Sequence, residues 1–384
     1  MAMRFPGVGG HVESIVYGES TPEGLQTLQK PTTAWEILFY LGIHFSEELL
    51  SQSITRDASF TAFVLSMGAL KRFTASFFAV RFPDAWTPSS EALRSEVERL
   101  GGVAFQQGEW RRASDVGLRE LWILLFLELF DASSRVRGWS DEFDRPLWGL
   151  GLVDETSNAR EPAVMDVKIG FLRYSPHTPK EKVARIDLKE EGSICRKVAL
   201  RPCGFRRFIH RNLPCSQHTT TEVEELERPL LFVIREDELS ALLRCFPSTV
   251  VSLTGGKPAT GAPRRSHWLC VKDCLDRITE DRRRAMREAI QNLLSFFQET
   301  IEGRHLIETM AFVSSSVLFV YDAAGGVETV RVRLIDFARS SYRYLNYDEQ
   351  TIGFVEGLQN LVKYLSSPVR LREGLIQANG EGDS

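Results

Sequence analysis

Residues 162–170 read Pro-Ala-Val-Met-Asp-Val-Lys-Ile-Gly and place an acid and a lysine two positions apart in an apolar stretch. Side chains of a β-strand alternate between its two faces, so Asp166 and Lys168 are expected to project to the same side. Pro162 marks the start of the strand, and Gly170 allows the turn that ends it. A carboxylate beside an ammonium group suits the binding of a phosphorylated ligand. An ordinary surface Asp–Lys pair on an edge strand is the alternative.

A second acid–base pair occurs near the N-terminus. Lys30 ends a strand-like stretch, and Glu36 lies on a helix that the sequence predicts from Thr33 onward. Thr33 is expected to be the N-cap of this helix, with Glu36 as its capping-box partner three residues later. In kinase-like lobes a strand lysine paired with a helix glutamate is held against the phosphates of a nucleotide. Solvated Lys and Glu side chains are common, so a solvated pair is the alternative.

A third candidate is Asp336, which follows the strand-like stretch 330–335 and precedes Phe337. A carboxylate at such a strand end can hold a divalent cation that bridges the β- and γ-phosphates of a nucleotide. An aspartate that only caps a turn is the alternative. Transfer of a γ-phosphoryl group needs cations on the phosphates and a carboxylate for the metal, and Lys30, Lys168 and Asp336 could supply both.

These stretches resemble motifs of the inositol polyphosphate kinase family, which includes the multikinases, the trisphosphate 3-kinases and the hexakisphosphate kinases. Residues 162–170 resemble the family's Pro-x-x-x-Asp-x-Lys-x-Gly signature, and residues 335–338 resemble its Ile-Asp-Phe-Ala motif. Residues 314–321 are similar to its Ser-Ser-Leu-Leu strand. The motifs stand in the family's order, which makes the resemblance more specific than any one of them.

The resemblance to subgroups of the family is mixed. Residues 28–40 look like the opening of the hexakisphosphate kinases, whereas residues 164–170 look like the multikinases. Trp35 stands where the family usually has arginine, and Arg339 stands where it often has histidine. The Lys30 to Glu36 pairing is expected to survive the first of these departures.

The resemblance implies a nucleotide-binding role for five positions. Lys30, paired with Glu36, would contact the phosphates of ATP. The carbonyl of Val153 and the amide of Glu155 would face adenine in a connector between two lobes. Asp166 would hold the ribose hydroxyls, because a carboxylate accepts two hydroxyl protons well.

The resemblance also implies the positions that handle the metal and the acceptor. Asp336 would hold Mg²⁺ and thereby the nucleotide, while Lys168 would reach the acceptor and the transferred phosphate. Lys182 aligns with a lysine that faces the acceptor in the family, and Lys180 and Arg185 lie on the same predicted short helix. A solvated basic face is the alternative for this set and for a second basic group, which comprises Arg196, Lys197, Arg201, Arg206, Arg207 and Arg211.

The fold class that the resemblance implies is α+β, a two-lobed fold of the protein-kinase-like inositol polyphosphate kinase type. It has a small N-terminal antiparallel-sheet lobe and a larger C-terminal lobe with a helical and loop insertion that binds the acceptor. The expected boundaries are 1–152 for the first lobe, with an insertion at about 81–146, and 153–368 for the second, with an acceptor-binding segment at 171–289. Residues 369–384 are expected to form a flexible tail.

Several local patterns add detail to this division. Residues 89–100 predict an amphipathic helix, and the apolar run 121–129 predicts a buried one, too short to span a bilayer. Residues 171–284 are rich in basic residues, Pro and Gly, and are expected to be largely irregular. A helix is predicted at 281–299, with Arg282–Arg284 solvated or paired with Glu280 and Asp281.

Composition restricts the partners and the compartment. The net charge of −4 gives no general attraction to nucleic acid or to a membrane, so an anion site must be a local cluster of basic side chains. The first ten residues lack the apolar core of a signal peptide. The six cysteines show no metal-ligand spacing, which fits a reduced intracellular setting, cytoplasmic or nuclear. A monomer is expected.

The sequence therefore predicts an ATP- and Mg²⁺-dependent inositol polyphosphate kinase that acts, like the multikinases, on inositol tris- and tetrakisphosphates. A hexakisphosphate kinase that makes inositol pyrophosphates is the first alternative. A catalytically weak scaffold that binds inositol phosphates is the second. No carboxylate base is evident, so positioning and charge neutralisation are expected to carry most of the rate.

Overall fold

The structure is a computed structural model that describes residues 15–52, 58–84, 86–101, 109–115, 117–135, 147–174, 178, 180–191, 193–212, 219–226, 231, 234–248, 277–342 and 352–366. The predicted tail 369–384 lies outside these ranges. Within them, no helix is both long enough and apolar enough to cross a membrane.

The N-terminal part of the chain forms an antiparallel sheet with the strand order β1-β2-β5-β3-β4. Residues 154–161, here called the connector, follow β5 and lead to the next strand. The strands of this first sheet are β1 (Val16–Tyr17), β2 (Thr27–Thr32), β3 (Phe77–Arg81), β4 (Trp110–Arg112) and β5 (Trp148–Val153).

Among the described residues, five helices accompany the first sheet: α1 (Ala34–His44), α2 (Ser46–Gln52), α3 (Ala58–Leu70), α4 (Glu91–Arg99) and α6 (Arg119–Arg135). The apolar run predicted to form a buried helix is confirmed, since Trp122 and Phe126 of α6 are fully buried. Helix α4 is also confirmed, and Ser90 is its N-cap. Glu128, the acid within the apolar run, accepts hydrogen bonds from the backbone N–H groups of Ser89 and Ser90. It thus provides acceptors for N–H groups at the start of α4 that have no partner within the helix.

A second antiparallel sheet has the strand order β11-β10-β6-β7-β8. The signature stretch is β6, and it pairs on both sides, with β10 and with β7. The alternative of a solvated pair on an edge strand is therefore wrong. The strands are β6 (Pro162–Ile169), β7 (Leu200–Asn212), β8 (Thr219–Leu226), β10 (Ser316–Asp322) and β11 (Arg331–Ile335).

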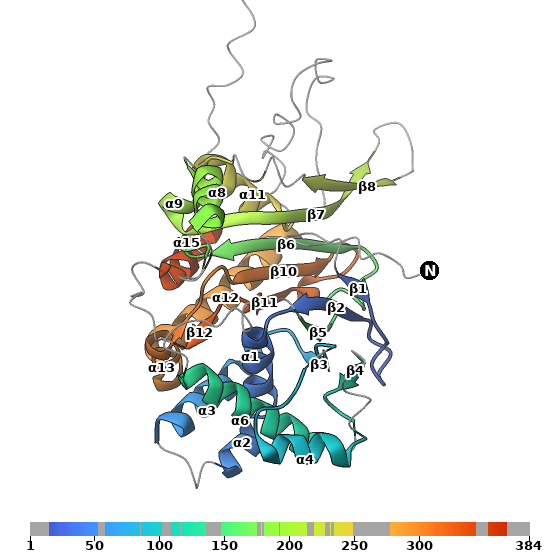
Figure 1. Cartoon of the computed structure of the whole chain (residues 1–384). Helices are drawn as coiled ribbons and strands as arrows, with labels where there is room; N and C mark the ends of the chain where they lie inside the picture. The colour runs from blue at the N-terminus through green and yellow to red at the C-terminus, as the bar shows by residue number, and fades with distance from the viewer. Residues whose placement is uncertain are drawn as a thin grey trace, which may run out of the picture.

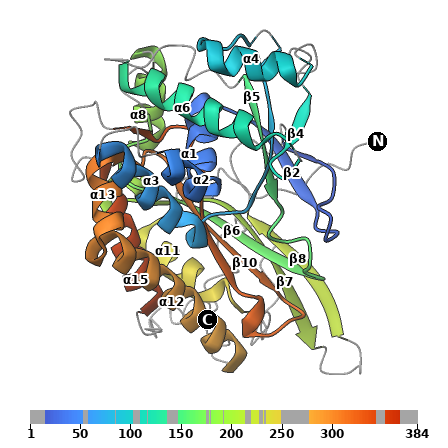
Figure 2. The ribbon, with the colours of Figure 1, turned by 90° about the horizontal axis from the view of Figure 1, so that it is seen from below.

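Helices α12 and α15 pack against each other, and they contact β11 and β6 of the second sheet respectively. Figure 2 shows them side by side on the opposite flank of this sheet from the first sheet. Phe297, Phe312 and Phe354 pack together in this core, with ring centroids 4.7–5.5 Å apart. Phe312 and Phe354 are stacked, and Phe297 meets both of them edge to face. The remaining elements are α8 (Lys180–Glu190), α9 (Cys195–Val198), α11 (Glu236–Cys245), α12 (Arg277–Glu299), α13 (Ile301–Thr309) and α15 (Phe354–Ser366), with the short pair β9 (Met310–Ala311) and β12 (Ser341–Tyr342).

The predicted α+β class is confirmed, because helices pack beside two separate five-stranded antiparallel sheets in the described part of the chain. Figure 1 shows the first sheet and helices α1–α6 in the lower part of the molecule and the second sheet in the upper part. The connector joins the two parts, and the C-terminal end of β11 returns to the boundary between them.

The expectation that residues 171–284 are largely irregular is wrong for much of the described region. Strands β7 and β8 form a hairpin that widens the second sheet, and α8 and α11 are helical. Two basic side chains of β7 are neutralised across the hairpin. Arg206 lies opposite Glu225 and Arg207 opposite Glu224, with ion-pair distances of 3.4 and 2.6 Å.

The prediction for the basic run at 282–284 is correct for two residues and wrong for one. Arg283 pairs with Glu280, and Arg284 pairs with Asp281 at 3.4 Å. Arg282 is instead 1% exposed, and its guanidinium donates to backbone carbonyls at 3.1–3.3 Å. These carbonyls, contributed by the loop after α11 and by the β10–β11 turn, belong to Pro247, Asp322 and Ala323.

Candidate functional site

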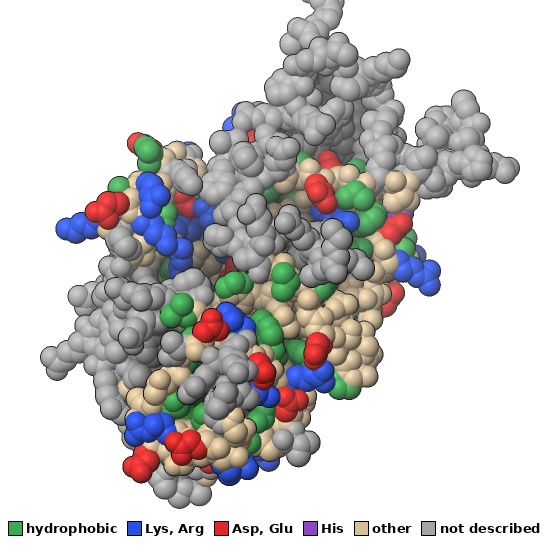
Figure 3. All heavy atoms as spheres, turned by 45° about the vertical axis from the view of Figure 1, so that its right-hand side comes forward, with side chains coloured by type: hydrophobic (Ala, Val, Ile, Leu, Met, Phe, Trp, Pro, Cys, Tyr) green, Lys and Arg blue, Asp and Glu red, His purple; other side chains and the backbone are tan. Residues whose placement is uncertain are grey.

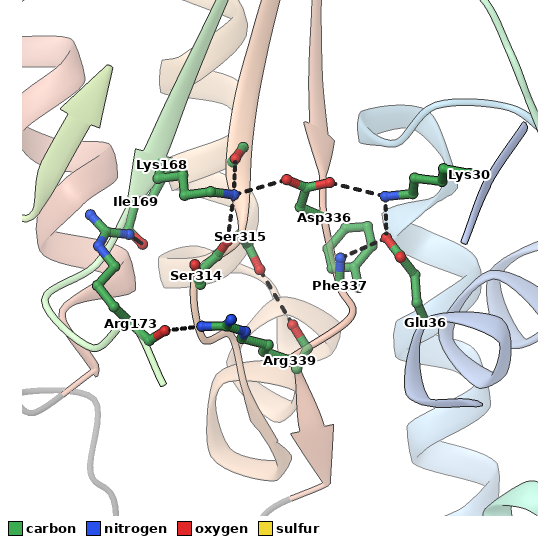
Figure 4. Close-up of polar contacts among 12 residues, drawn as sticks. Lys30, Glu36, Lys168, Ile169, Arg173, Ser314, Ser315, Asp336, Phe337 and Arg339 are labelled. Carbon is green, nitrogen blue, oxygen red and sulfur yellow. Dashed lines mark hydrogen bonds and ion pairs between the residues drawn. The ribbon is translucent and has the colours of Figure 1, made fainter. Parts of the chain in front are cut away.

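Asp336 lies directly after β11, where the second sheet meets the first. Its φ of 64° places it in the left-handed region, so the chain turns sharply and the carboxylate points to the boundary between the sheets. Oδ2 accepts from Lys168 Nζ at 2.8 Å, and Oδ1 accepts from Lys30 Nζ at 3.0 Å (Figure 4). Two predicted lysines from different sheets therefore meet on one predicted carboxylate.

Glu36 completes the other side of this network from helix α1. Its side chain is 1% exposed, and Oε1 accepts from Lys30 Nζ at 3.0 Å and from the backbone N–H of Phe337 at 2.9 Å. The predicted Lys30 to Glu36 pair is thus present. It ties α1 to the residue that follows Asp336, as well as to β2.

The predicted capping box is wrong. Thr33 is the N-cap of α1, but its side chain makes no capping hydrogen bond. Its hydroxyl donates instead to the carbonyl of Ala338 at 2.9 Å. The Glu36 carboxylate is engaged by Lys30, Thr32 and Phe337. Contacts with the distant segment 337–338 have replaced the local contacts that the sequence pattern predicted.

The charges in this network stabilise each other. Partial burial alone would raise the pKa of Asp336, but the nearby ammonium groups of Lys168 and Lys30 hold it well below its usual range. Burial alone would lower the pKa of Lys30, but the carboxylates of Glu36 and Asp336 raise it above its usual range. Both lysines stay cationic and Asp336 stays anionic at neutral pH, as binding of phosphate and metal requires.

Lys168 is held in place by strand β10 as well as by Asp336. Its ammonium donates to Ser316 Oγ at 3.1 Å and to the carbonyl of Ser314 at 3.2 Å. Ser314 has a φ of 59°, which is unusual for a serine. Neither Ser314 nor Ser316 was among the predicted site residues. The sequence contained a sign of their role, since both serines lie in the stretch that resembles the family's Ser-Ser-Leu-Leu strand.

The strand register confirms that Asp166 and Lys168 share one face. Lys168 lies opposite Ser316 of β10, and Asp166 lies opposite Leu318. Directly opposed residues of antiparallel strands project to the same side of a sheet. Because Lys168 reaches Asp336, which also accepts from Lys30 of the first sheet, this face is the one turned toward the first sheet.

Asp166 is a buried carboxylate with an unused acceptor. Its side chain is 4% exposed, and within the described part of the chain Oδ1 has no hydrogen-bond partner. Burial raises the pKa of this carboxyl group, and the Asp336 carboxylate adds to the increase, whereas the Lys168 ammonium opposes it. A free acceptor in such surroundings is stabilised by a hydroxyl donor, which is the group that a ribose offers.

Val153 ends β5 and Glu155 lies in the connector, and these are the two residues predicted to face adenine. The amide of Val153 donates to Ser76, and the amide of Asp154 donates to Gln26, at 2.9 and 2.8 Å. The Glu155 carboxylate accepts from Arg333 Nε of β11 at 2.9 Å. Arg333 was not among the predicted site residues.

The predicted acceptor residues lie apart from the Asp336 network. Lys180, Lys182 and Arg185 are exposed on α8, and within the described residues none of them contacts Lys30, Lys168 or Asp336. Figure 3 shows Lys and Arg side chains gathered at the upper left, in the region where Figure 1 draws α8 and α9.

Asp336 fits a metal site in which a nucleotide supplies the other ligands. Among the described residues, no group of three or more His, Cys, Asp and Glu side chains is placed to hold a metal ion. Mg²⁺ in phosphoryl-transfer sites is typically bound by one or two carboxylates together with phosphate oxygens and water. The Asp336 side chain is 34% exposed, so its oxygens are accessible to such an ion.

A lysine–carboxylate–lysine network between two sheets, beside a connector, is the arrangement of a kinase-type nucleotide site. The family model of inositol polyphosphate kinases matches residues 150–259 and 263–366, more than half of the chain. The chain belongs to the inositol polyphosphate kinase family.

Solved structures similar to this chain include two of inositol phosphate multikinase. One is 19% identical and aligns over 56% of this chain and 83% of the other, with a TM-score of 0.39. The second, from S. cerevisiae in complex with ADP and Mn²⁺, is 15% identical over 57% of this chain and 82% of the other, also with a TM-score of 0.39. No curated protein matches this chain significantly.

Proposed function

We propose that this chain is an ATP-dependent kinase that transfers the γ-phosphoryl group of ATP to a hydroxyl of an inositol tris- or tetrakisphosphate. Membership of the inositol polyphosphate kinase family supports the reaction class. The observation that carries the proposal is the position of Asp336 between Lys30 and Lys168, with part of its carboxylate exposed. This arrangement offers a metal ligand and two phosphate-binding cations at one point.

In this proposal the residues act by position and charge. Lys30, fixed by Glu36, binds the nucleotide phosphates, and Asp166 accepts hydrogen bonds from the ribose. Lys168 neutralises charge that develops on the transferred group and orients the acceptor hydroxyl. A divalent cation, proposed to be Mg²⁺ on Asp336, supplies further neutralisation of the phosphate charge. Correct placement of ATP and acceptor is a major source of rate in such a reaction.

The acceptor is proposed to bind between Lys168 and helix α8. Inositol polyphosphates carry many phosphate groups, and exposed lysines and arginines provide matching charge. Lys182 is the principal candidate, with Lys180 and Arg185 beside it. Both the exposure of these side chains and the basic surface over α8 support this location.

Two alternative functions are each favoured by particular residues. The stretch around Lys30 resembles the hexakisphosphate kinases, which favours pyrophosphate synthesis from the hexakisphosphate. Trp35 and Arg339, the two departures from the family pattern, favour a weak or inactive binding protein. Trp35 is buried on α1, and Arg339 donates to the carbonyl of Arg173, while the Lys30 to Glu36 pair is intact.

The test is product analysis with purified protein, ATP, Mg²⁺ and a panel of inositol phosphates from the tris- to the hexakisphosphate. The proposal expects a phosphorylated product from the tris- or tetrakisphosphate, with stoichiometric ADP. A product formed only from the hexakisphosphate would favour the first alternative. Tight binding of the panel without turnover by any member would exclude the kinase and leave the scaffold.

A further inference from the structure

An ion pair joins the connector to strand β11. Arg333 Nε lies 2.9 Å from Glu155 Oε1, and the two side chains are 26% and 12% exposed. Residues this poorly exposed are only weakly screened by solvent, so their interaction is stronger than that of a typical surface pair. Neither residue belongs to the network around Asp336.

Arg333 stands in the same row of the second sheet as Asp166. Both residues lie opposite Leu318 of β10, one on each neighbouring strand, and therefore project from the same face. Neighbouring strands are about 4.8 Å apart, so the backbones of Arg333 and Asp166 are separated by roughly 10 Å across the sheet. Because Asp166 is the proposed ribose-binding residue, this short separation places the ion pair beside the ribose position.

Packing around the connector is incomplete. A cavity of about 260 Å³ lies between the connector and strands β10 and β11, and its lining includes Val153, Glu155, Val320 and Arg333. Apolar contacts therefore do not fix this part of the connector on all sides. Further along, Asp322 accepts the backbone N–H groups of residues 160 and 161 at 3.0 Å each. The connector is thus held to the second sheet by polar contacts at two points.

We propose that Arg333 is a positioning residue for the nucleotide base. By holding the Glu155 side chain, it fixes the backbone of residues 153–155, whose carbonyl and amide would bind adenine. This inference rests on the proposed function. Loss of the ion pair removes one restraint on the connector beside the cavity, and the base then binds to a less ordered backbone, which weakens binding.

The test is Arg333→Met, with Arg331→Met as the matched control. Arg331 lies on the same strand and borders the same cavity, but it is exposed and donates to the carbonyls of Glu328 and Val330 in its own segment. Calorimetry would measure binding of adenosine, ATP and inorganic tripolyphosphate by each variant. We expect Arg333→Met to weaken the binding of adenosine and of ATP about tenfold and to leave the binding of tripolyphosphate unchanged. For Arg331→Met, the dissociation constants of all three ligands should stay within about twofold of the wild-type values.

Reversing the charges of the ion pair distinguishes a positioning role from a general loss of stability. Glu155→Arg and Arg333→Glu should each weaken adenosine binding, and the double variant should recover most of the loss, because the pair is restored in the opposite sense. Unchanged adenosine binding by Arg333→Met would overturn the inference, as would an equal loss for adenosine and tripolyphosphate. A wild-type protein that bound neither ATP nor adenosine would instead overturn the proposed function itself.

Discussion

Lys168 Nζ lies 2.8 Å from Oδ2 of Asp336, although the two residues are 168 positions apart in the chain. Lys168 lies on β6 and Asp336 follows β11, and β10 runs between these two strands. Lys168 crosses β10 by passing over Ser316, its opposite residue, to which it also donates. Lys30 approaches the same carboxylate from the first sheet, so the two sheets are joined at the point where phosphoryl transfer is proposed.

Asp336→Asn tests the proposed metal ligand. An amide binds Mg²⁺ poorly and cannot neutralise two ammonium groups, so we expect turnover to fall by at least about 100-fold. Circular dichroism should show an unchanged fold. The control is Asp84→Asn, which alters an aspartate that is 77% exposed in an ion pair with Arg81. Turnover near the wild-type value in Asp336→Asn would contradict the assignment.

Lys30→Met and Lys168→Met should affect different kinetic constants. Lys30 is paired with Glu36 beside the nucleotide phosphates, so its loss should raise KM for ATP about tenfold or more. Lys168 is proposed to stabilise the transition state, so its loss should lower kcat about 100-fold with a smaller change in KM. Steady-state kinetics at varied ATP measures both constants, with exposed Lys71→Met as the control. Identical changes in both variants would remove the distinction between the roles.

Asp166→Asn should increase stability at neutral pH. The raised pKa of Asp166 means that the folded state holds its proton more tightly than the unfolded state, so the charged form opposes folding. The gain should therefore be absent below the ordinary pKa of 3.8, grow as the pH rises toward the folded-state pKa, and remain constant above it. A tenfold difference in proton affinity between the folded and unfolded states corresponds to about 1.4 kcal/mol. Thermal unfolding from pH 3 to pH 8 measures the effect.

Asp322 provides the opposite case for the same experiment. Burial alone would raise its pKa, but the backbone N–H groups of Arg160, Glu161 and Ala324 lower it below the usual range. Asp322→Asn should therefore destabilise the protein at neutral pH, and the loss should disappear as the pH falls through the folded-state pKa. Stability changes of the same sign for Asp166→Asn and Asp322→Asn at neutral pH would contradict the opposite pKa shifts of the two carboxylates.

Arg282→Met should destabilise the protein far more than Arg284→Met. Arg282 donates to several backbone carbonyls and lies over the Tyr321 ring, with 4.7 Å from guanidinium carbon to ring centroid. Its removal leaves buried carbonyls without donors, which we expect to cost about 3 kcal/mol. Arg284 is 60% exposed, so its loss should cost less than about 0.5 kcal/mol. Urea unfolding measures both, and equal midpoints would refute the structural role of Arg282.

The sequence alone determined the local features of the site. Alternation along 162–169 placed Asp166 and Lys168 on one face, as the strand register confirms. Gly170 ends the strand with a φ of 90°, and a Cβ there would lie 2.6 Å from the carbonyl oxygen of Ile352, so a glycine is required. The Lys30 to Glu36 pair also spans few residues. Such features depend on the period of a strand or on short separations, which a single sequence displays.

Only the tertiary structure decided which distant groups meet. Thr33 donates to Ala338 rather than to its own helix, and Arg333 reaches Glu155 across 178 positions of the chain. Arg282 carries the same charge as its two neighbours, yet it alone is buried. These outcomes depend on strand order and on the approach of two sheets. Charged side chains find partners wherever the folded chain places an opposite charge or a free carbonyl, and sequence spacing does not contain that information.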